Sequence, residues 1–162
     1  MDIIKYIIIM LMAASFRNGL NTDLIPYEQQ ISYINEYVFE IIEEGNYDVH
    51  PAFILAVIET ESTYKWQAQN GEHYGLMQIN PKWQKERMKK LGIEEINANP
   101  YDNIRVGIDY ISELFEIYDN PYDVLNVYNS GSTDGYTHSY SIDVMEKFYR
   151  IEHDMWDNME GW

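Results

Sequence analysis

One glutamate stands where a helical pattern would bury it. Ile54, Val57 and Ile58 share one face of a helix that begins at Pro51, and Glu61, three residues after Ile58, falls on that same face. A carboxylate on an apolar face is costly unless it is paired, protonated or functional. Partial burial raises the pKa of a carboxyl group, as a general acid near neutral pH requires. Taken alone, the pattern also fits an exposed residue at a helix end, so Glu61 is a candidate acid and no more.

Lys65 is the nearby basic residue that would oppose a rise in the pKa of Glu61. At four residues after Glu61 it could form an ion pair along a helix, which would hold the carboxyl pKa down. The pair requires that the helix continue past Ser62, and we do not expect it to do so.

Two further motifs follow Glu61-Ser62 along the chain. They are Gly75-Leu76-Met77-Gln78 and Tyr128-Asn129-Ser130-Gly131, and between them lies the stretch 99–104, which opens a long apolar helix. Glu-Ser and Tyr-Asn carry little information alone, whereas Gly-Leu-Met-Gln at this distance from Glu-Ser is specific. In order and spacing, across roughly residues 48–150, the motifs resemble the soluble lytic transglycosylase (SLT) domain of the lysozyme-like superfamily, which also contains goose-type lysozymes.

This resemblance implies a role for each matching position. Glu61 would donate a proton to the glycosidic oxygen and then act as a base, and Ser62 would help to set the end of its helix. Met77 and Gln78 would line the sugar groove. The remaining two matching residues would form one wall, with the Tyr128 hydroxyl near the Glu61 carboxyl and Asn129 beside it. Structural alternatives remain open, because Met77 suits ordinary core filling and Ser62 suits any helix end.

The matched motifs supply one carboxylate, whereas typical glycosidases use two. The resemblance implies a lytic transglycosylase that cleaves the MurNAc-GlcNAc β-1,4 bond of peptidoglycan without water, because the muramyl C6 hydroxyl closes a 1,6-anhydro ring. Goose-type lysozymes commonly carry an acid where this chain has Asn80, which favours the non-hydrolytic reaction. A hydrolytic, goose-type-like lysozyme is the alternative, with Glu72 or Asp134 as a substitute second acid. A third hypothesis is an inactive relative that binds glycan or serves as an assembly component.

Four aromatic residues bracket the first two motifs and could stack on sugar rings: Tyr64, Trp66, Tyr74 and Trp83. Large aromatic side chains in a small domain are more often core, so we select only Tyr74 as a groove residue. The four histidines show no spacing typical of a metal site, and the chain has no cysteine. We therefore predict no metal and no cofactor.

Length and charge limit the fold and the partners. The 162 residues suffice for one compact domain, and a formal net charge of −16 disfavours nucleic acid as a partner. One basic run, residues 82–90, we interpret as a solvated helix face. Binding to peptidoglycan glycan strands would therefore depend on specific sugar contacts. A secretion, conjugation or phage apparatus is the setting that the resemblance suggests.

Proline positions and apolar spacing predict a mainly α, lysozyme-like small helical domain with at most a minor β element. Three Asn-Pro pairs, at 80–81, 99–100 and 120–121, each indicate a helix start, because asparagine caps helices and proline suits their first position. Helical stripes run over 31–45, 104–118 and 140–155.

The N-terminal 20 residues stand apart in composition. Their apolar run, Tyr6 to Ser15, is shorter than the roughly 20 residues of a membrane-spanning helix but has the length of a signal-peptide core. We divide the chain into residues 1–20, a signal segment or a buried N-terminal helix, and residues 21–162, a lytic transglycosylase-like catalytic domain. The expected location is extracytoplasmic or cell-wall-associated, or else phage-borne or cytoplasmic before release.

Overall fold

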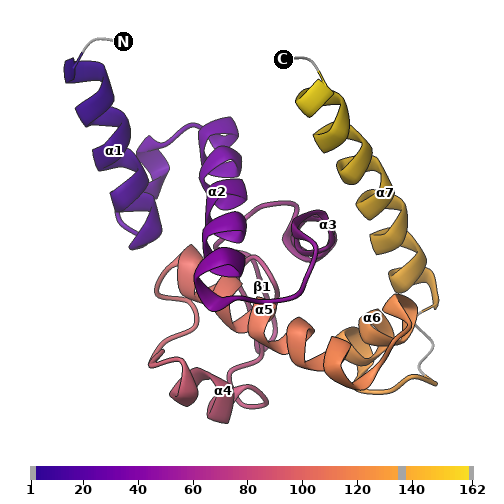
Figure 1. Ribbon diagram of the computed structural model, residues 1–162. Coiled ribbons are helices and arrows are strands. Elements are labelled where there is room, and N and C mark those ends of the chain that lie inside the picture. Colours follow the sequence, from indigo (N-terminus) through magenta and orange to yellow (C-terminus); the bar gives the residue numbers. More distant parts are fainter. Residues whose placement is uncertain (1–2, 135–137, 161–162) are drawn as a thin grey trace.

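Helices joined by short loops make up most of the chain in the computed structural model, which describes residues 3–134 and 138–160 (Figure 1). Two strands of two residues each form the one sheet found there, an antiparallel pair. The mainly α fold class is therefore confirmed. In chain order the elements are α1 Ile3–Arg17, η1 Thr22–Leu24, α2 Tyr27–Gly45, α3 Pro51–Ser62, β1 Gln69–Asn70, β2 His73–Tyr74, α4 Lys85–Lys90, α5 Pro100–Ile117, α6 Pro121–Ser130 and α7 His138–Glu160.

Two of the three Asn-Pro pairs begin helices as predicted. At the start of α5 the Asn99 side chain accepts a hydrogen bond from the amide of Asp102, and at the start of α6 Asn120 accepts one from Tyr122. These bonds satisfy amides that have no partner inside the helix. In both helices the following proline occupies the first turn, where its missing N–H costs nothing.

The pair at 80–81 does not begin a helix, so that prediction is wrong. The Asn80 side chain accepts a hydrogen bond from the Lys82 amide at 3.0 Å, and its carbonyl accepts one from Trp83 at 3.2 Å. These bonds close turns rather than the first turn of an α-helix, and α4 begins only at Lys85. The Asn80 side chain does accept a backbone amide, as a helix cap would, but the residues that follow it form a turn.

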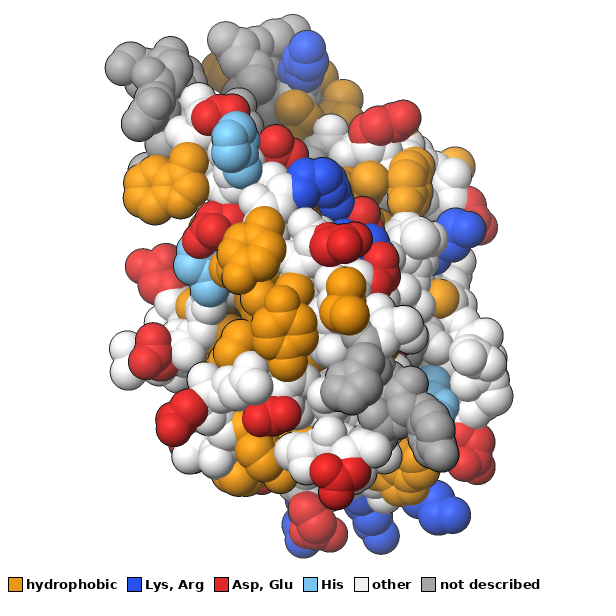
Figure 2. Space-filling model, turned by 90° about the vertical axis from the view of Figure 1, so that its right-hand side faces the viewer, with side chains coloured by type: hydrophobic (Ala, Val, Ile, Leu, Met, Phe, Trp, Pro, Cys, Tyr) orange, Lys and Arg blue, Asp and Glu red, His pale blue; other side chains and the backbone are white. Residues whose placement is uncertain are grey.

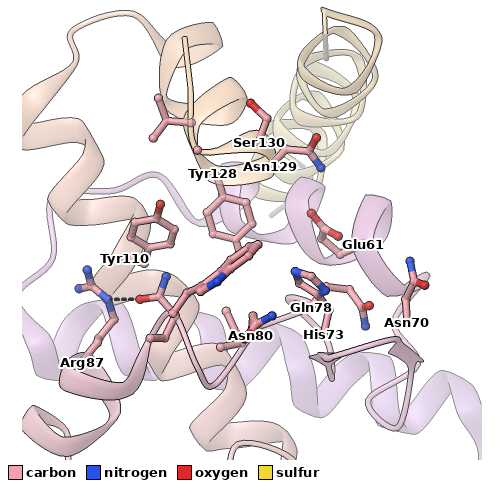
Figure 3. A pocket seen from close by; sticks show the side chains of 15 residues that line it. Glu61, Asn70, His73, Gln78, Asn80, Arg87, Tyr110, Tyr128, Asn129 and Ser130 are labelled. Carbon is pink, nitrogen blue, oxygen red and sulfur yellow. Dashed lines mark hydrogen bonds between the residues drawn. The ribbon is translucent and has the colours of Figure 1, made fainter. Parts of the chain in front are cut away.

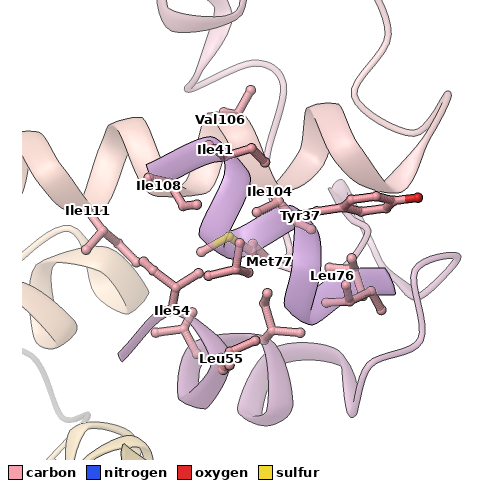
Figure 4. Close-up of a cluster of buried hydrophobic side chains, with 14 of the residues drawn as sticks. Tyr37, Ile41, Ile54, Leu55, Leu76, Met77, Ile104, Val106, Ile108 and Ile111 are labelled. Atoms are coloured by element: carbon pink, nitrogen blue, oxygen red, sulfur yellow. The ribbon is translucent and has the colours of Figure 1, made fainter. Parts of the chain in front are cut away.

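The core lies where α2, α3 and α5 meet around the loop between β2 and α4 (Figure 4). α3 is its centre, because every residue from Ala52 to Ile58 is buried. α7 packs along α3 and α6, so a helix far away in sequence covers the outer side of the central one (Figure 1). This arrangement holds the C-terminal end of α3 against α7.

α1 joins the core at one end only. Phe16 is fully buried and its ring lies 5.9 Å from Tyr33 and 6.4 Å from Trp66, centre to centre. Arg17 pairs with Glu40 at 2.7 Å. Most apolar side chains nearer the N-terminus are exposed, so burial of this helix is limited to its C-terminal end. None of the described helices is both long and apolar enough to cross a membrane.

Candidate active site

Glu61 lies in the last turn of α3, with its carboxyl group largely enclosed by protein. The helix ends after Ser62 because Thr63 adopts a left-handed conformation, with φ of 49°. Lys65 therefore follows the end of the helix, as we expected. Burial disfavours the charged carboxylate and raises the pKa of Glu61 to about 6. A group with this pKa carries a proton in a useful fraction of molecules near neutral pH.

Tyr140, on α7, is the hydrogen-bond partner of this carboxyl group. Its hydroxyl donates to Oε1 of Glu61 at 2.6 Å, a bond that favours the charged form and so lowers the Glu61 pKa against the larger effect of burial. Burial and the Glu61 charge raise the pKa of Tyr140 well above its ordinary value. The phenol therefore stays protonated and remains a donor.

The Gly75–Gln78 turn forms the floor below Glu61, and it is fixed to α5 by one buried side chain. Asn103 accepts a hydrogen bond from the Met77 amide at 2.9 Å and donates one to the Tyr74 carbonyl at 2.8 Å. Gly75 has φ of +78°, and a Cβ atom there would lie 2.4 Å from the Asn103 side chain. The turn thus requires glycine for both its conformation and its approach to α5.

The opposite wall comes from α6, which presents Tyr128 and Asn129. The Tyr128 hydroxyl donates a hydrogen bond to the Met77 carbonyl at 2.8 Å, so its hydrogen-bond partner is the turn. Tyr128 is still near enough for the Glu61 charge to raise its pKa, in addition to the larger effect of burial. Tyr128 therefore joins the wall to the floor, while Tyr140 contacts the acid.

These elements enclose a groove with a cavity volume of about 660 Å³, into which Glu61 points (Figure 3). Asn129 and Ser130 lie on one side of the Glu61 carboxyl, and Gln78 and His73 on the other (Figure 3). Within the described parts of the chain, Glu61 is the one carboxylate that lines this groove. The full lining is Glu61, Asn70, His73, Gln78, Ile79, Asn80, Trp83, Gln84, Arg87, Tyr110, Val127, Tyr128, Asn129, Ser130 and Gly131.

Four predicted site residues, Glu61, Gln78, Tyr128 and Asn129, meet in this groove, but Met77 does not. Its side chain is fully buried in the core among residues of α2, α3 and α5 (Figure 4). The space it fills is left by Gly107 on α5, where a Cβ atom would lie within 2.2 Å of the Met77 sulfur. Met77 is core filling, and it serves the site through its backbone.

Tyr74 and Ser62 also lie outside the lining. Successive residues of a strand point to opposite faces, so on β2 the side chain of His73 lines the groove while Tyr74 packs against the core. The Ser62 hydroxyl donates to the Ile58 carbonyl at 3.0 Å within its own helix. Ser62 is thus a buried residue at the end of its helix. For His73, the alternation of side chains along β2 is the sequence signal that could have identified it as a groove residue.

Several lining residues and the hydrogen-bond partner of Glu61 were not predicted from the sequence. Tyr140 fell within an apolar helical stripe, which gave no sign that its hydroxyl meets a residue 79 positions earlier. Arg87 belonged to the run that we interpreted as a solvated face, and this interpretation is wrong for it. The Arg87 side chain is 10% exposed, and its guanidinium group pairs with Asp109 and Glu113 and lies 5.0 Å from the Tyr110 ring centre.

A comparison with known families now adds to this geometry. The family model described as "Transglycosylase SLT domain" matches residues 39–138, more than half of the chain. The chain belongs to this family. The matched range contains Glu61 and both later motifs of the SLT domain, whereas Tyr140 lies two residues beyond its end.

A solved structure supports the same assignment. The chain is similar to lytic transglycosylase Slt from Pseudomonas aeruginosa, with 26% sequence identity and a TM-score of 0.52. The similarity covers 59% of this chain and 16% of that one, so it concerns one part of a much longer protein. The predicted resemblance to the SLT family and to the lysozyme-like superfamily is therefore confirmed.

No cluster of three metal-binding side chains (His, Asp or Glu) occurs in residues 3–134 and 138–160. The expectation that the protein needs no metal and no cofactor stays a prediction.

Proposed function

We propose that this chain cleaves the β-1,4 bond between N-acetylmuramic acid and N-acetylglucosamine in peptidoglycan without water. The observation that carries the proposal is the arrangement of Glu61, the one carboxylate among the described residues of the groove, with a pKa raised by burial to about 6. The similar Pseudomonas aeruginosa lytic transglycosylase was solved as an inactive glutamate-to-glutamine mutant, which supports a glutamate as the essential group. Such a protein acts outside the cytoplasm, where its substrate lies.

A single carboxyl group suffices because its proton is used and then returned. Protonated Glu61 donates to the glycosidic oxygen as the bond from that oxygen to the muramyl C1 breaks. The muramyl C6 hydroxyl then attacks C1 and gives its proton to the Glu61 carboxylate, which closes the 1,6-anhydro ring. No water is consumed, and the acid is regenerated. A pKa near 6 suits both halves of this cycle, since the group must give and accept a proton at similar pH.

The groove offers little support for hydrolysis, which would need a second group to hold and activate a water molecule. Asn80 lines the groove at the position where goose-type lysozymes commonly carry an acid, but its side-chain oxygen already accepts the Lys82 amide. Glu72 and Asp134 are both exposed and are not part of the lining. The arrangement therefore favours the anhydro product.

Asn129 provides an amide group on one side of Glu61, suited to the hydroxyl and acetamido groups of sugars. On the other side, the Gln78 Nε2 group donates to the Gly75 and Ala68 carbonyls, so the side-chain oxygen of Gln78 is the group that can accept a hydrogen bond from a sugar. Tyr140 holds the carboxyl group in one orientation through the 2.6 Å hydrogen bond. Tyr128 fixes the Met77 carbonyl and so the turn that positions Gln78. We assign Glu61 to catalysis, Gln78 and Asn129 to substrate binding, and the two tyrosines to positioning.

The test is mass spectrometry of purified peptidoglycan after digestion by the wild-type protein and by Glu61→Gln. We expect anhydromuramyl products from the wild type and none from the variant, which keeps the shape of the side chain and removes its proton. Glu72→Gln and Asp134→Asn are matched controls that should retain activity. If the wild type instead produces reducing ends, and these are lost in Glu72→Gln or in Asp134→Asn, the protein is a lysozyme. A folded wild type that cleaves no peptidoglycan would contradict the enzyme proposal and favour a glycan-binding or assembly role.

A further inference from the structure

Trp83 is a large, solvent-exposed aromatic side chain that lines the groove. It is 72% exposed to solvent although it lines the same cavity as Glu61. Exposure of an indole ring in a folded protein forgoes the stabilisation that its burial would give. A ring in this position is therefore available to contact a ligand that enters the groove.

The backbone around Trp83 is fixed, so the ring is presented by a rigid segment. The amides of Trp83 and Gln84 both donate to the Asn80 carbonyl, at 3.2 Å and 3.1 Å. Gln84 in turn accepts a hydrogen bond from Arg87 at 2.9 Å (Figure 3). Arg87 is anchored to α5 through Asp109, which ties this segment to the core. A preorganised platform loses little entropy when a ligand binds.

His73 sets one edge of this platform. It comes from the β1–β2 hairpin, and its ring meets the Trp83 ring edge to face, with the ring centres 5.5 Å apart and an interplanar angle of 78°. Both side chains line the groove. The contact brings together two loops that sequence alone does not relate, and it restricts the orientation of the indole.

The groove around the platform is almost uncharged. Arg87 is its one lysine or arginine among the described lining residues, and it is neutralised by Asp109 and Glu113. The neighbouring polar groups are amides, among them Asn70 and Gln84. Amides bind hydroxyl and acetamido groups without favouring a charged ligand, and an aromatic face matches the C–H face of a pyranose ring.

We propose that Trp83, with His73 at its edge, forms a stacking subsite for an uncharged N-acetylhexosamine ring of the glycan strand. The assignment rests on the function proposed above, because it places a second sugar of the same strand beside the one at Glu61. Trp83 binds substrate in this scheme and takes no part in proton transfer. From the sequence, Trp83 was one of four aromatic residues that could stack on sugar rings, but only Tyr74 was selected as a groove residue.

The experiment is calorimetric titration of the Glu61→Gln protein with a soluble chitin oligosaccharide, an uncharged probe made only of N-acetylglucosamine. In this inactive background, Trp83→Ala should weaken binding by about tenfold, and Trp83→Phe by less, since it keeps a smaller aromatic face. Trp156→Ala is the matched control, because Trp156 is 59% exposed on α7 and does not line the groove. It should leave the affinity unchanged.

The assignment is overturned if Trp83→Ala binds the probe as tightly as its parent, or if the parent itself does not bind. An equal loss in Trp156→Ala would also overturn it, since the effect would then be unrelated to the groove. Thermal unfolding of each variant shows that the fold is retained. Cleavage of peptidoglycan by the wild type is scored separately, so a protein that binds through Trp83 but does not cleave would contradict the catalytic proposal alone.

Discussion

At the scale of single residues, the chemistry of the site depends on two opposing effects on Glu61. Burial raises its pKa, and the hydrogen bond from Tyr140 lowers it, with burial the larger. The result, about 6, keeps the group able to donate a proton near neutral pH and to accept one afterwards. The Tyr140 hydroxyl thus orients the proposed acid and limits the rise of its pKa that burial causes.

Removal of the Tyr140 hydroxyl should move the pH dependence of activity. In the wild type, kcat/KM for peptidoglycan should fall as pH rises through about 6, because the proton donor is lost. Tyr140→Phe removes a bond that stabilises the carboxylate, so the Glu61 pKa rises and the fall should shift to higher pH. A turbidity assay over a pH series measures both profiles. Tyr149→Phe, at an exposed tyrosine of the same helix, should not shift the fall.

An unchanged profile in Tyr140→Phe, or a shift to lower pH, would contradict this role. A lower maximal rate alone would not decide the matter, because any misplacement of Glu61 reduces activity. The direction of the shift is therefore the informative result.

At the scale of elements, the groove is assembled around α5 from three parts. These are the C-terminal end of α3, the Gly75–Gln78 turn and the C-terminal end of α6. Asn103 holds the turn through its hydrogen bonds to Met77 and Tyr74, and Gly107 leaves the space that Met77 occupies. The Gly-Leu-Met-Gln motif is therefore matched to two residues of α5 that lie about one helical turn apart. Its sequence specificity reflects packing as much as contact with substrate.

Gly107→Ala should destabilise the fold by about 1–3 kcal/mol, because the new methyl group overlaps the Met77 side chain in a filled core. The greater helix propensity of alanine offsets part of this cost. In a Met77→Ala background the same substitution should cost much less, since the overlapping atoms are gone. Urea unfolding of the wild type, the two single variants and the double variant measures the coupling energy between Met77 and Gly107. Equal costs in both backgrounds would show that Met77 and Gly107 do not meet.

At the scale of the whole molecule, the N-terminal helix is divided between core and solvent. Phe16 packs against Tyr33, Tyr37 and Trp66, so the C-terminal end of α1 belongs to the folded body. A patch of hydrophobic side chains is visible on the face that carries α7 (Figure 2). Phe53, Phe115 and Phe148 line a pocket separate from the groove. The division at residue 20 stays a prediction, although the packing of Phe16 ties the two parts together.

Phe16→Ala should reduce the free energy of unfolding by about 3–5 kcal/mol, the usual cost of removing a fully buried aromatic ring. Ile7→Ala, on the exposed part of the same helix, should change it by less than about 0.5 kcal/mol. Urea unfolding monitored by circular dichroism compares the two. Similar small effects from both substitutions would show that α1 does not dock on the core.

The sequence by itself determined the helical architecture and selected the candidate acid. Apolar spacing and proline positions are local signals, so they correctly indicated the helices that begin at Pro51, Pro100 and Pro121. Glu61 was selected because its position on an apolar face and the motif order both depend on sequence alone. The same local signals failed at Pro81, where the Asn80 side chain caps a turn instead of a helix.

Only the tertiary structure decided which side chains surround the acid. The sequence left open whether Met77 lines the groove or fills the core, and whether Trp83 is exposed. Met77 is fully buried and Trp83 is 72% exposed, because burial depends on how the folded turn packs and not on residue type. Tyr140 reaches Glu61 because α7 packs along α3, a contact between segments 79 residues apart that no local pattern encodes. Contacts of this kind fix the pKa of Glu61 and the lining of the groove, since both depend on what the completed fold brings together.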